Sequence, residues 1–599
     1  MPPLHWHGHG GGNDERAGSP LATLARLFSL LKGRRRALGI LLVPLVLSSF
    51  SGLVWPRAMG LAMDTMKLSE DATFAVDWRR LAVVFAIGTV AVLAGQAAAL
   101  WMAYGTVSLS NKTVRDMRGM LFGHVQSLPV ARFDSMKRGE FMSRLTNDID
   151  MVANTLGPGI LEFAGSVFGL TLTLGYMLWL SPAMTLAACA TLPLTILTAR
   201  GVAGVSRRLF RARQKTLGEL NGFTEEMLSG QPVVRAFHRE EAVGARFAET
   251  SETLRGLSVR AETLGGFMWP MMGAINNLGF LLVATIGGWL ALRGEITVGV
   301  IITFIAYARQ FGRPVSMLAN QFTQIQSSIA GAERVFAMLD MDPETDTGKR
   351  VARRDAIRGA IEFDRVCFAY EPGRPVLDNF TLRVPPGAKI ALVGETGSGK
   401  TTVINLLSRF YEPDSGRILV DGADVREFTK ASLRSCMAVV LQDTRLFGGT
   451  IAQNIAFGRP GATREEVVAA ARLANADLFI DRLPEGYETN IAQNETLLSQ
   501  GQRQLLAIAR AALSDPAILI LDEATSNVDT RTELHIQQAM QRLMRDRTSV
   551  IIAHRVSTIR DADTILVMRD GRISESGTHA ELMALDGIYA GYNKRVPVG

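Results

Sequence analysis

The sequence predicts a two-part protein, in which an α-helical domain with six membrane spans is followed by an α/β domain. Long apolar segments recur between residues 37 and 328. After residue 361, short strand-like runs alternate with amphipathic helical patterns, and one such run leads into a glycine-rich loop. A chain of 599 residues is too long for one hydrophobic core, so at least two domains are expected.

The composition favours a membrane protein. Hydrophobic residues make up 47% of the chain and charged residues 20%. This hydrophobic share is high for a soluble protein of this size. The net charge of +7 fits either nucleic acid or an anionic membrane surface. Basic residues flank the apolar segments, which favours the membrane. Cys189, Cys367 and Cys436 show neither a metal-binding nor a disulfide spacing, so reduced structural thiols are expected.

The N-terminal residues 1–20 are predicted to be a disordered tail, because they are rich in glycine, proline and histidine without apolar periodicity. His5, His7 and His9 alternate and would suit a metal ion, although incidental histidines are the simpler interpretation. No signal peptide is expected. Apolar residues at helical spacing over 21–31 predict a helix in the membrane interface, with a soluble amphipathic helix as the alternative.

Six apolar segments follow, each long enough to cross a hydrocarbon core of about 30 Å. They lie near residues 37–62, 79–107, 157–181, 183–206, 266–293 and 296–328. Lysine and arginine crowd the loops 108–156 and 207–262, whereas the other loops are short and nearly free of them. The positive-inside rule places the N-terminus, both long loops and the C-terminal half in the cytoplasm. Residues 21–335 are therefore the predicted transmembrane domain.

The two long loops are predicted to be helices that extend into the cytosol. Each is interrupted once, at Pro129 and at residues 230–232, and such breaks would present short transverse helices to a partner domain. Polar residues within the spans, among them Glu162, Asn276 and Gln310, fit two interpretations. They indicate either a substrate path near spans five and six or hydrogen bonds between helices.

Residues 336–360 form the predicted linker, and residues 361–599 the α/β domain. There an apolar strand, 390–393, leads into a loop of the form G-x-x-x-x-G-K-[ST]. Glycines in such a loop let backbone N–H groups surround phosphates, Lys400 would reach the β- and γ-phosphates, and the Thr401 hydroxyl would bind Mg²⁺. The nucleotide-binding residues predicted here are Gly394, Glu395, Thr396, Gly397, Ser398, Gly399, Lys400, Thr401 and Thr402.

A second apolar strand, 518–521, ends in two carboxylates, Asp522 and Glu523. Ligands of α/β sheets bind at such strand ends. Asp522 would hold Mg²⁺, and Glu523 would activate the attacking water as general base. The alternative is that the two acids stand at the end of the strand by chance. The presence of Lys400 in the phosphate loop weakens this alternative.

Residues 361–590 resemble the nucleotide-binding domain of an ATP-binding cassette (ABC) transporter. The resemblance rests on further short motifs in the order of that family. These are Phe368-Ala369-Tyr370, Gln442 in Val-Leu-Gln-Asp-Thr, Leu498-Ser499-Gln500-Gly501-Gln502, Ser526-Asn527-Val528-Asp529, and His554 in Ile-Ile-Ala-His-Arg. With six spans ahead of them, residues 21–599 resemble an exporter half-transporter of the multidrug or lipid type, which implies the type IV (type I) exporter fold.

The resemblance also implies roles for these residues. Tyr370 would stack on adenine, Gln442 would sense Mg²⁺ and the γ-phosphate, and His554 would contact the γ-phosphate. Ser499, Gly501 and Gln502 would meet ATP that is held by a second half-transporter. Glu523, His554 and Gln442 are therefore the expected catalytic residues, and Thr401, Gln442 and Asp522 the expected Mg²⁺ ligands.

Two departures from the commoner family pattern bear on the partner chain. Gln500 replaces a glycine of the signature, and Asn527-Val528 replaces Ala-Leu. Both are similar to the catalytically intact subunit of some heterodimeric bacterial exporters. A sister chain is therefore slightly favoured over a second copy.

The expected function is ATP-driven export of amphipathic small molecules, drugs or lipids, by alternating access across the cytoplasmic membrane. The alternative is an exporter of one cargo, such as a peptide, a siderophore or a metal–thiol conjugate. No peptidase domain is recognised before the first span, which weighs against leader-peptide processing. A soluble ABC ATPase acting on DNA would also fit the basic charge, but the six spans and the lack of a long coiled coil argue against nucleic acid as partner.

Overall fold

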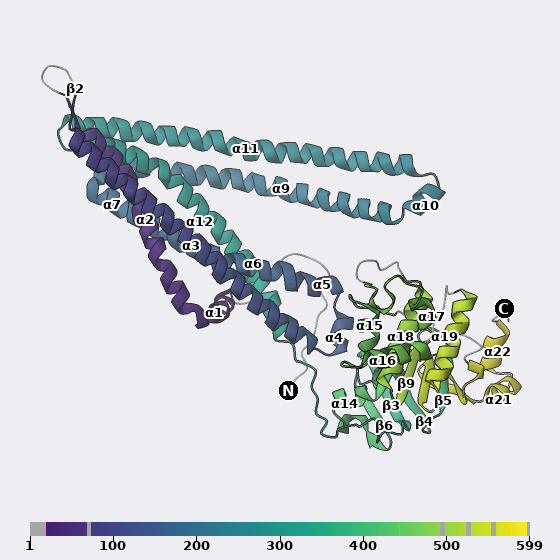
Figure 1. Cartoon of the computed structure of the whole chain (residues 1–599). Helices are drawn as coiled ribbons and strands as arrows, with labels where there is room; N and C mark the ends of the chain where they lie inside the picture. The colour runs from purple at the N-terminus through teal and green to yellow at the C-terminus, as the bar shows by residue number, and fades with distance from the viewer. Residues whose placement is uncertain are drawn as a thin grey trace. The chain divides into compact units, whose positions relative to one another are not determined.

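A computed structural model of the chain describes residues 20–30, 32–68, 74–441, 444–491, 498–522, 529–552 and 559–595 (Figure 1). Contacts between residues divide the chain into two units. The helical unit comprises residues 1–126 and 138–341, and the α/β unit comprises residues 127–137 and 342–599. The predicted tail with His5, His7 and His9 lies outside the described residues, apart from Pro20.

The helical unit is built from long helices joined by short turns. Its helices are α1 (Pro20–Leu30), α2 (Arg35–Asp64), α3 (Trp78–Gln126), α5 (Arg138–Ser143), α6 (Ile149–Asn154), α7 (Ile160–Leu180), α8 (Pro182–Cys189), α9 (Leu192–Ser229), α10 (Gln231–Ala236), α11 (Glu240–Leu292) and α12 (Val298–Leu339). The remaining elements are a 3₁₀ turn (Lys32–Arg34), two π-helical turns (Arg144–Asp148 and Thr155–Gly159), and an antiparallel ribbon of β1 (Met66–Leu68) and β2 (Phe74–Val76). The long helices α9 and α11 run side by side and are joined by α10 (Figure 1).

Five stretches of helix, among the described residues, are long and apolar enough to cross a membrane. They are α2, α3, α7, the α8–α9 stretch Pro182–Ser229, and α11. In α12, at the predicted sixth span, the apolar section found is the shorter Val298–Gln310. The predicted fourth span, 183–206, is interrupted, because α8 ends at Cys189 and α9 begins at Leu192. Pro193, in the first turn of α9, has no N–H group to continue the hydrogen bonds of α8.

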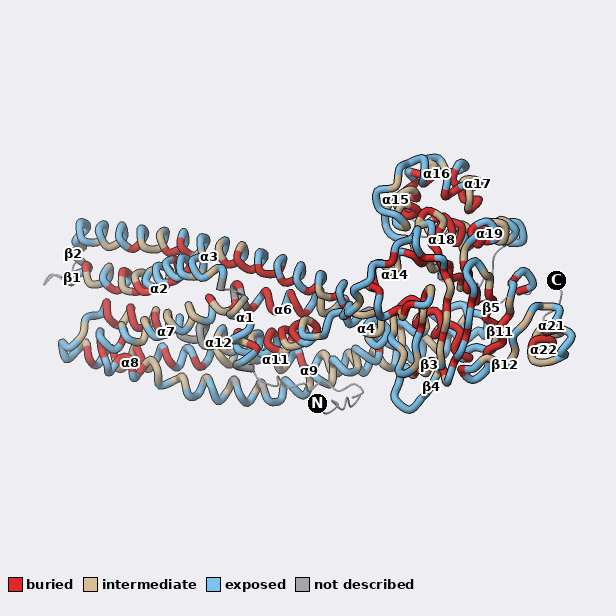
Figure 2. The backbone as a smooth tube through the Cα atoms, turned by 90° about the horizontal axis from the view of Figure 1, so that it is seen from below, coloured by how far each residue is buried: buried red, intermediate tan, exposed pale blue. Residues whose placement is uncertain are grey.

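Apolar side chains cover the outside of the helical unit. The exposed fraction is 86% for Trp269 and 91% for Leu292, and pale blue runs along the long helices in Figure 2. Such surfaces suit a protein whose solvent is lipid, because apolar side chains gain nothing there by burial. At the start of α12, the Asp64 carboxylate of α2 accepts hydrogen bonds from the Gly299 N–H and the Thr297 hydroxyl, both at 2.9 Å.

The two predicted breaks in the long loops are confirmed. α3 ends at Gln126, and Pro129 then precedes the short helix α4 (Val130–Ser135). α9 ends at Ser229, and α10 begins after Gly230. By its contacts α4 belongs to the α/β unit.

The α/β unit contains two sheets and a set of short helices. Its strands are β3 (Ile361–Glu371), β4 (Arg374–Val384), β5 (Lys389–Gly394), β6 (Ser415–Val420), β7 (Ala423–Asp424), β8 (Met437–Val440), β9 (Ile518–Asp522), β10 (Thr548–Ile552), β11 (Thr564–Arg569) and β12 (Arg572–Gly577). Besides α4, its helices are α13 (Lys400–Leu407), α14 (Lys430–Ser435), α15 (Ile451–Ala456), α16 (Arg464–Leu473), α17 (Asp477–Ile480), α18 (Gln500–Ser514), α19 (Thr530–Leu543), α21 (His579–Ala584) and α22 (Ile588–Arg595), with 3₁₀ turns at Val425–Glu427 and Gly486–Glu488.

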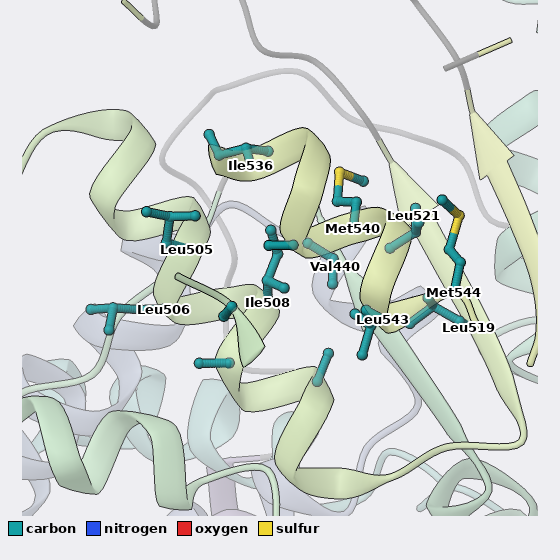
Figure 3. Packing of buried hydrophobic residues seen from close by; sticks show 14 of the residues in the cluster. Val440, Leu505, Leu506, Ile508, Leu519, Leu521, Ile536, Met540, Leu543 and Met544 are labelled. Atoms are coloured by element: carbon teal, nitrogen blue, oxygen red, sulfur yellow. The ribbon is translucent and has the colours of Figure 1, made fainter. Parts of the chain in front are cut away.

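The larger sheet has the order β12-β11-β5-β10-β9-β8, and all neighbours except the β11–β12 pair are parallel. The smaller sheet, β4-β3-β6-β7, is antiparallel. The parallel strands are buried on both faces, as the continuous apolar runs of the sequence predict. On one face, Leu519 and Leu521 pack with α18 and α19 (Figure 3). On the other, Ile518 and Ile520 join the core beside the smaller sheet.

Candidate nucleotide site

The predicted phosphate loop joins the central strand β5 to helix α13. Its lysine, Lys400, is buried with an exposed fraction of 7%. The Nζ atom donates hydrogen bonds to the carbonyl oxygens of Gly394 at 2.7 Å and Glu395 at 2.8 Å. Burial lowers the pKa of Lys400, and Asp522 partly offsets this shift because a nearby negative charge stabilises the ammonium. Lys400 is thus held inside the predicted phosphate loop.

The loop backbone needs glycine at two of its positions. Gly397 has a φ of 88° and Gly399 a φ of 100°, in the left-handed region that other residues seldom adopt. A Cβ atom at Gly399 would also lie 2.8 Å from the Cδ2 atom of Leu377. Thr401, in the first turn of α13, is exposed, whereas Thr402 is buried. The loop therefore presents backbone groups, and the exposed Thr401, at the start of a helix.

Strand register brings the first predicted acid to the same edge of the sheet. Ile552 of β10 pairs with Leu392 of β5 on one side and with Asp522 of β9 on the other. Because these strands are parallel, their carboxyl ends meet at one edge. Asp522 and the start of the phosphate loop therefore share this edge, as the sequence predicts.

Tyr370, the predicted adenine-stacking residue, belongs to a cluster of three rings. It is 44% exposed, and its ring centroid lies 4.8 Å from that of Phe368 and 5.0 Å from that of Tyr411, both edge-on. The Tyr370 hydroxyl accepts a hydrogen bond from Asn405 Nδ2 at 3.0 Å and lies 3.2 Å from Thr402 Oγ1. These contacts fix the ring beside the first turns of α13.

Sequence reasoning missed Tyr411. Its hydroxyl donates a 2.7 Å hydrogen bond to the Asp134 carboxylate of α4, within the same unit. Burial and this carboxylate raise the pKa of Tyr411, because both disfavour the phenolate. Tyr411 therefore connects the ring of Tyr370 with α4, in the first of the two long loops. The pattern Arg-Phe-Tyr-Glu-Pro around it gives no sign of this role.

The predicted signature residues form a separate group at the start of α18. The Ser499 hydroxyl accepts a hydrogen bond from the Gln502 N–H at 3.3 Å, and the Gln502 side chain accepts one from the Ser499 N–H at 2.9 Å. This capping box satisfies the first turn of the helix. Ser499 is exposed and Gly501 is buried. Within the described part of the chain, Ser499 and Gln502 have no hydrogen-bond partner on the phosphate loop.

Three predicted site residues, Gln442, Glu523 and His554, lie outside the described residues. In the sequence they follow β8, β9 and β10, which are adjacent strands of the larger sheet. Their predicted roles stay predictions.

The helical unit contains two adjoining cavities. The first cavity, of about 330 Å³, is lined by α2, α3, α7 and α12, with Ser49, Glu162 and Thr173 among its residues. The second cavity, of about 540 Å³, lies along α2, α3 and α12. Both include Ser48 and Gln310, so they share a wall. Of the intramembrane polar residues predicted from the sequence, Glu162 and Gln310 line a cavity.

Comparison with known proteins agrees with this architecture. Residues 38–315 match the family model of the ABC transporter transmembrane region, and residues 377–526 match that of the ABC transporter domain. The chain is 44% identical over 569 residues to an uncharacterised ABC transporter ATP-binding protein of Bacillus subtilis (strain 168), covering 95% of this chain and 93% of the relative.

Two further relatives have described cargoes. A fatty acid ABC transporter ATP-binding/permease protein of Mycobacterium bovis is 44% identical over 521 residues, covering 87% of this chain and 82% of the relative. The ATP-dependent lipid A-core flippase of Salmonella typhimurium is 39% identical over 492 residues, covering 81% and 84%.

A solved structure shares the fold over nearly the whole chain. It is a bacterial Atm1-family ABC exporter with ATP bound, with a TM-score of 0.73 and 30% identity, and the match covers 94% of this chain and 99% of that one. The predicted fold class, a transmembrane helical domain followed by an α/β nucleotide-binding domain, is confirmed. The chain therefore belongs to the ABC transporter family, as an exporter half-transporter of a bacterial inner membrane that hydrolyses ATP to drive export.

Proposed function

We propose that each ATP site is shared between this chain and a second half-transporter. The phosphate loop of one chain would face the start of α18 in the other. The observation that carries this proposal is the separation described above: Ser499 and Gln502 are bonded to each other and, among the described residues, not to the phosphate loop. The Ser499 hydroxyl accepts a hydrogen bond, so its own hydrogen stays available for a phosphate oxygen.

The residues present fit a magnesium-bound triphosphate. The left-handed glycines Gly397 and Gly399 carry no side chain that would stand between the loop backbone and a phosphate, and α13 begins at the loop, where its dipole favours an anion. Lys400 would exchange its two carbonyl partners for phosphate oxygens. Thr401 and Asp522, with Gln442, would hold Mg²⁺, which supplies positive charge to the phosphate oxygens.

The catalytic roles are assigned to three residues that follow neighbouring strands in the sequence. Glu523 would accept a proton from the attacking water, because it follows Asp522 directly and is the next carboxylate along the chain. His554 would donate a hydrogen bond to the γ-phosphate, and Gln442 would orient the water and Mg²⁺. Closure of the two cassettes around ATP, and their release after hydrolysis, would pass to the helices through the cytosolic loops.

The cargo is proposed to be an amphipathic small molecule, a drug or a lipid. The cavities support this proposal, because they combine hydroxyl and amide groups such as Ser49 and Gln310 with leucine and methionine walls. The cargoes of the two relatives, fatty acids and lipid A-core, are amphipathic too. The density of arginine and lysine in the long loops supports a cytoplasmic N-terminus and a cytoplasmic nucleotide-binding domain.

The partner is proposed to be a sister chain rather than a second copy, on the strength of Gln500 and Asn527-Val528. The test is to purify the transporter from its native membrane, identify its subunits by mass, and measure ATP hydrolysis in lipid nanodiscs with a panel of amphiphiles. Stimulation by several unrelated amphiphiles is expected. Stimulation by one compound alone would favour a dedicated exporter, and an ATPase indifferent to all of them would refute the proposed cargo class.

A further inference from the structure

We propose that the linker segment 342–358 positions both helices that are assigned to ATP, because it holds each of them at its carboxyl end. This segment continues the chain from α12 into the α/β unit. Its Glu344 acts on α13, which begins at the phosphate loop, and its Arg354 acts on α18, which begins at the predicted signature residues. The inference rests on the proposed nucleotide site and adds two positioning residues to it.

Glu344 holds α13 through Arg434 of α14. The Arg434 guanidinium donates two hydrogen bonds to the Glu344 carboxylate, at 2.7 and 2.9 Å. It also donates to the carbonyl oxygens of Ser408 at 3.1 Å and Arg409 at 2.7 Å. These two residues directly follow Leu407, the last residue of α13. Because the paired bonds to the carboxylate fix the plane of the guanidinium, they also fix the direction of its bonds to the end of α13.

The surroundings keep Glu344 charged and in place. Only 22% of its side chain is exposed, and Lys430 Nζ lies 3.3 Å from the carboxylate. The hydrogen bonds from Arg434 hold the pKa of Glu344 below its usual value, because they favour the ionised carboxyl group. On the backbone, the Glu344 N–H donates a 2.7 Å hydrogen bond to the Ser127 carbonyl oxygen. Glu344 is therefore a fixed point of the linker.

Arg354 holds α18, ten residues further along the linker. Asp515 caps the carboxyl end of α18, and its φ of 45° takes the chain out of the helix. Arg354 Nε donates a hydrogen bond to the Asp515 carbonyl oxygen at 2.5 Å, and Arg354 Nη2 lies 3.7 Å from the Asp515 carboxylate. Arg547 donates a further hydrogen bond to this carboxylate at 2.8 Å. Positive charge at this end of α18 also suits the helix dipole.

The linker is fixed between these two contacts. The Asp346 carboxylate accepts a hydrogen bond from the Lys430 N–H at 2.8 Å, and the Ser432 hydroxyl accepts one from the Ala352 N–H at 2.9 Å. Ala352 and Ile357 are buried in the core beside the smaller sheet. A segment that is bonded at several points moves as one piece. The linker therefore connects the far ends of α13 and α18.

The two helices have different tasks in the proposed nucleotide site. α13, of 8 residues and about 12 Å, carries the phosphate loop that holds the ATP of this chain. α18, of 15 residues and about 22 Å, meets the ATP of the second half-transporter when the cassettes close. A rigid helix that shifts at one end also shifts at the other. A change at Glu344 should therefore alter ATP binding, and a change at Arg354 should alter the hydrolysis that requires closure.

Two variants test the two contacts separately in the purified full-length transporter in nanodiscs. Glu344→Gln is expected to weaken binding of a fluorescent ATP analogue about three- to tenfold, because a neutral amide orients Arg434 less firmly. Arg354→Gln is expected to keep this affinity and to lower kcat for ATP hydrolysis about three- to tenfold. Glu362→Gln is the matched control, because it removes a 2.8 Å ion pair with Arg383 in the smaller sheet, and it should behave like the wild type in both measurements.

A double variant tests whether Glu344 acts through Arg434. Arg434→Gln should itself weaken ATP binding, and adding Glu344→Gln should change the affinity by less than about twofold more, because both substitutions break one connection. A merely structural role would lower the Tm of the variants and leave the ATP affinity and kcat of the folded protein unchanged. That result, or a full further loss of affinity in the double variant, would overturn the inference.

Hydrogen exchange in the wild-type transporter provides a test that needs no variant. Because coupling between two sites is reciprocal, ATP at the phosphate loop should slow amide exchange in linker peptides that contain Glu344 and Ala352, by about twofold or more. Exchange rates that ATP leaves unchanged would contradict the inference.

Lys400→Ala separates this inference from the proposed function. If Lys400→Ala binds ATP like the wild type, the proposed nucleotide site is refuted, and the inference with it. If Lys400→Ala loses affinity while folded Glu344→Gln and Arg354→Gln proteins keep wild-type affinity and kcat, the inference alone is refuted.

Discussion

The nucleotide site and the first cavity are both proposed binding sites, but they are built differently. The nucleotide site collects most of its described residues from one continuous loop and the end of a nearby strand, 394–402 and 522, at one edge of a sheet. The cavity takes single residues from four helices. A ligand of fixed shape, such as a triphosphate, requires a fixed backbone around it. An amphipathic cargo requires only a cavity wall of suitable polarity. Single substitutions should therefore have large effects at the first site and small effects at the second.

The largest effect is expected for Glu523→Gln. Loss of the proposed general base should lower the rate of ATP hydrolysis by about 10²–10⁴-fold, while ATP binding is retained. Phosphate release and binding of a fluorescent ATP analogue measure the two quantities. Glu485→Gln, at an exposed carboxylate of the same unit, should behave as wild type. Normal hydrolysis by the purified Glu523→Gln protein would refute the assigned base.

A pair of leucine substitutions compares a buried position of the α/β unit with an exposed position of the helical unit. Leu519 is completely buried in the α/β unit, whereas Leu292 is 91% exposed at the end of α11. Leu519→Ala should cost about 2–5 kcal/mol of stability, and Leu292→Ala less than about 1 kcal/mol. The loss of stability in each variant is measured by thermal unfolding in detergent, followed by size-exclusion chromatography. Equal losses would contradict the view that Leu292 faces lipid.

Lys400→Ala is expected to weaken ATP binding. A hydrogen bond to a charged group contributes about 1.5–3 kcal/mol, so the affinity should fall roughly ten- to a hundredfold or more. Photolabelling with an azido-ATP analogue measures the change, with Lys349→Ala, at an exposed lysine, as control. Unchanged labelling would count against the phosphate-loop role of Lys400.

Tyr411→Phe removes the hydrogen bond to Asp134 and keeps the ring against Tyr370. If this bond helps to hold α4, its loss of about 1 kcal/mol should reduce the amount of cargo exported per ATP hydrolysed roughly fivefold. Tyr487→Phe is a matched control, because the buried Tyr487 hydroxyl has no hydrogen-bond partner among the described residues. A ratio that stays the same in Tyr411→Phe would mean that this contact does not transmit the movement.

The smallest effect is expected in the cavity wall. Ser166→Ala removes one of several neutral hydroxyls that line the first cavity. The half-maximal concentration of a stimulating amphiphile should change by about two- to fivefold at most, because one hydrogen bond to a mobile ligand contributes about 0.5–1 kcal/mol. A change of more than tenfold would indicate a fixed cargo position, and thus a dedicated exporter.

The same contrast explains what the sequence could predict. The phosphate loop and Asp522 were predictable, because glycine, lysine and acid recur at spacings that the backbone geometry requires. The position of Tyr411 could not be predicted, because it depends on how α4 and the ring cluster pack. Hydropathy also did not separate α8 from α9: both sides of the break are apolar, and only Pro193 marks it.

The cavity could be anticipated only in part. Glu162 and Gln310 are polar residues inside apolar spans, and this indicates a functional or structural role. Serines such as Ser48 and Ser166 are common in helices and do not by themselves indicate a cavity. Polar residues inside a span are expected both where two helices are hydrogen-bonded and where cargo binds. The sequence alone therefore does not distinguish the two uses. In the structure Gln310 lines both cavities, whereas Glu162 lines the first cavity and also accepts a hydrogen bond from Gln321.

The most direct test of the account follows uptake of a fluorescent amphipathic compound into inside-out proteoliposomes that contain the purified transporter. Uptake is predicted to require hydrolysable ATP and Mg²⁺, and to be lost when Glu523 is replaced by glutamine in this chain. Accumulation that proceeds without ATP, or that persists undiminished in the Glu523→Gln protein, would contradict the claim that hydrolysis at this site drives export.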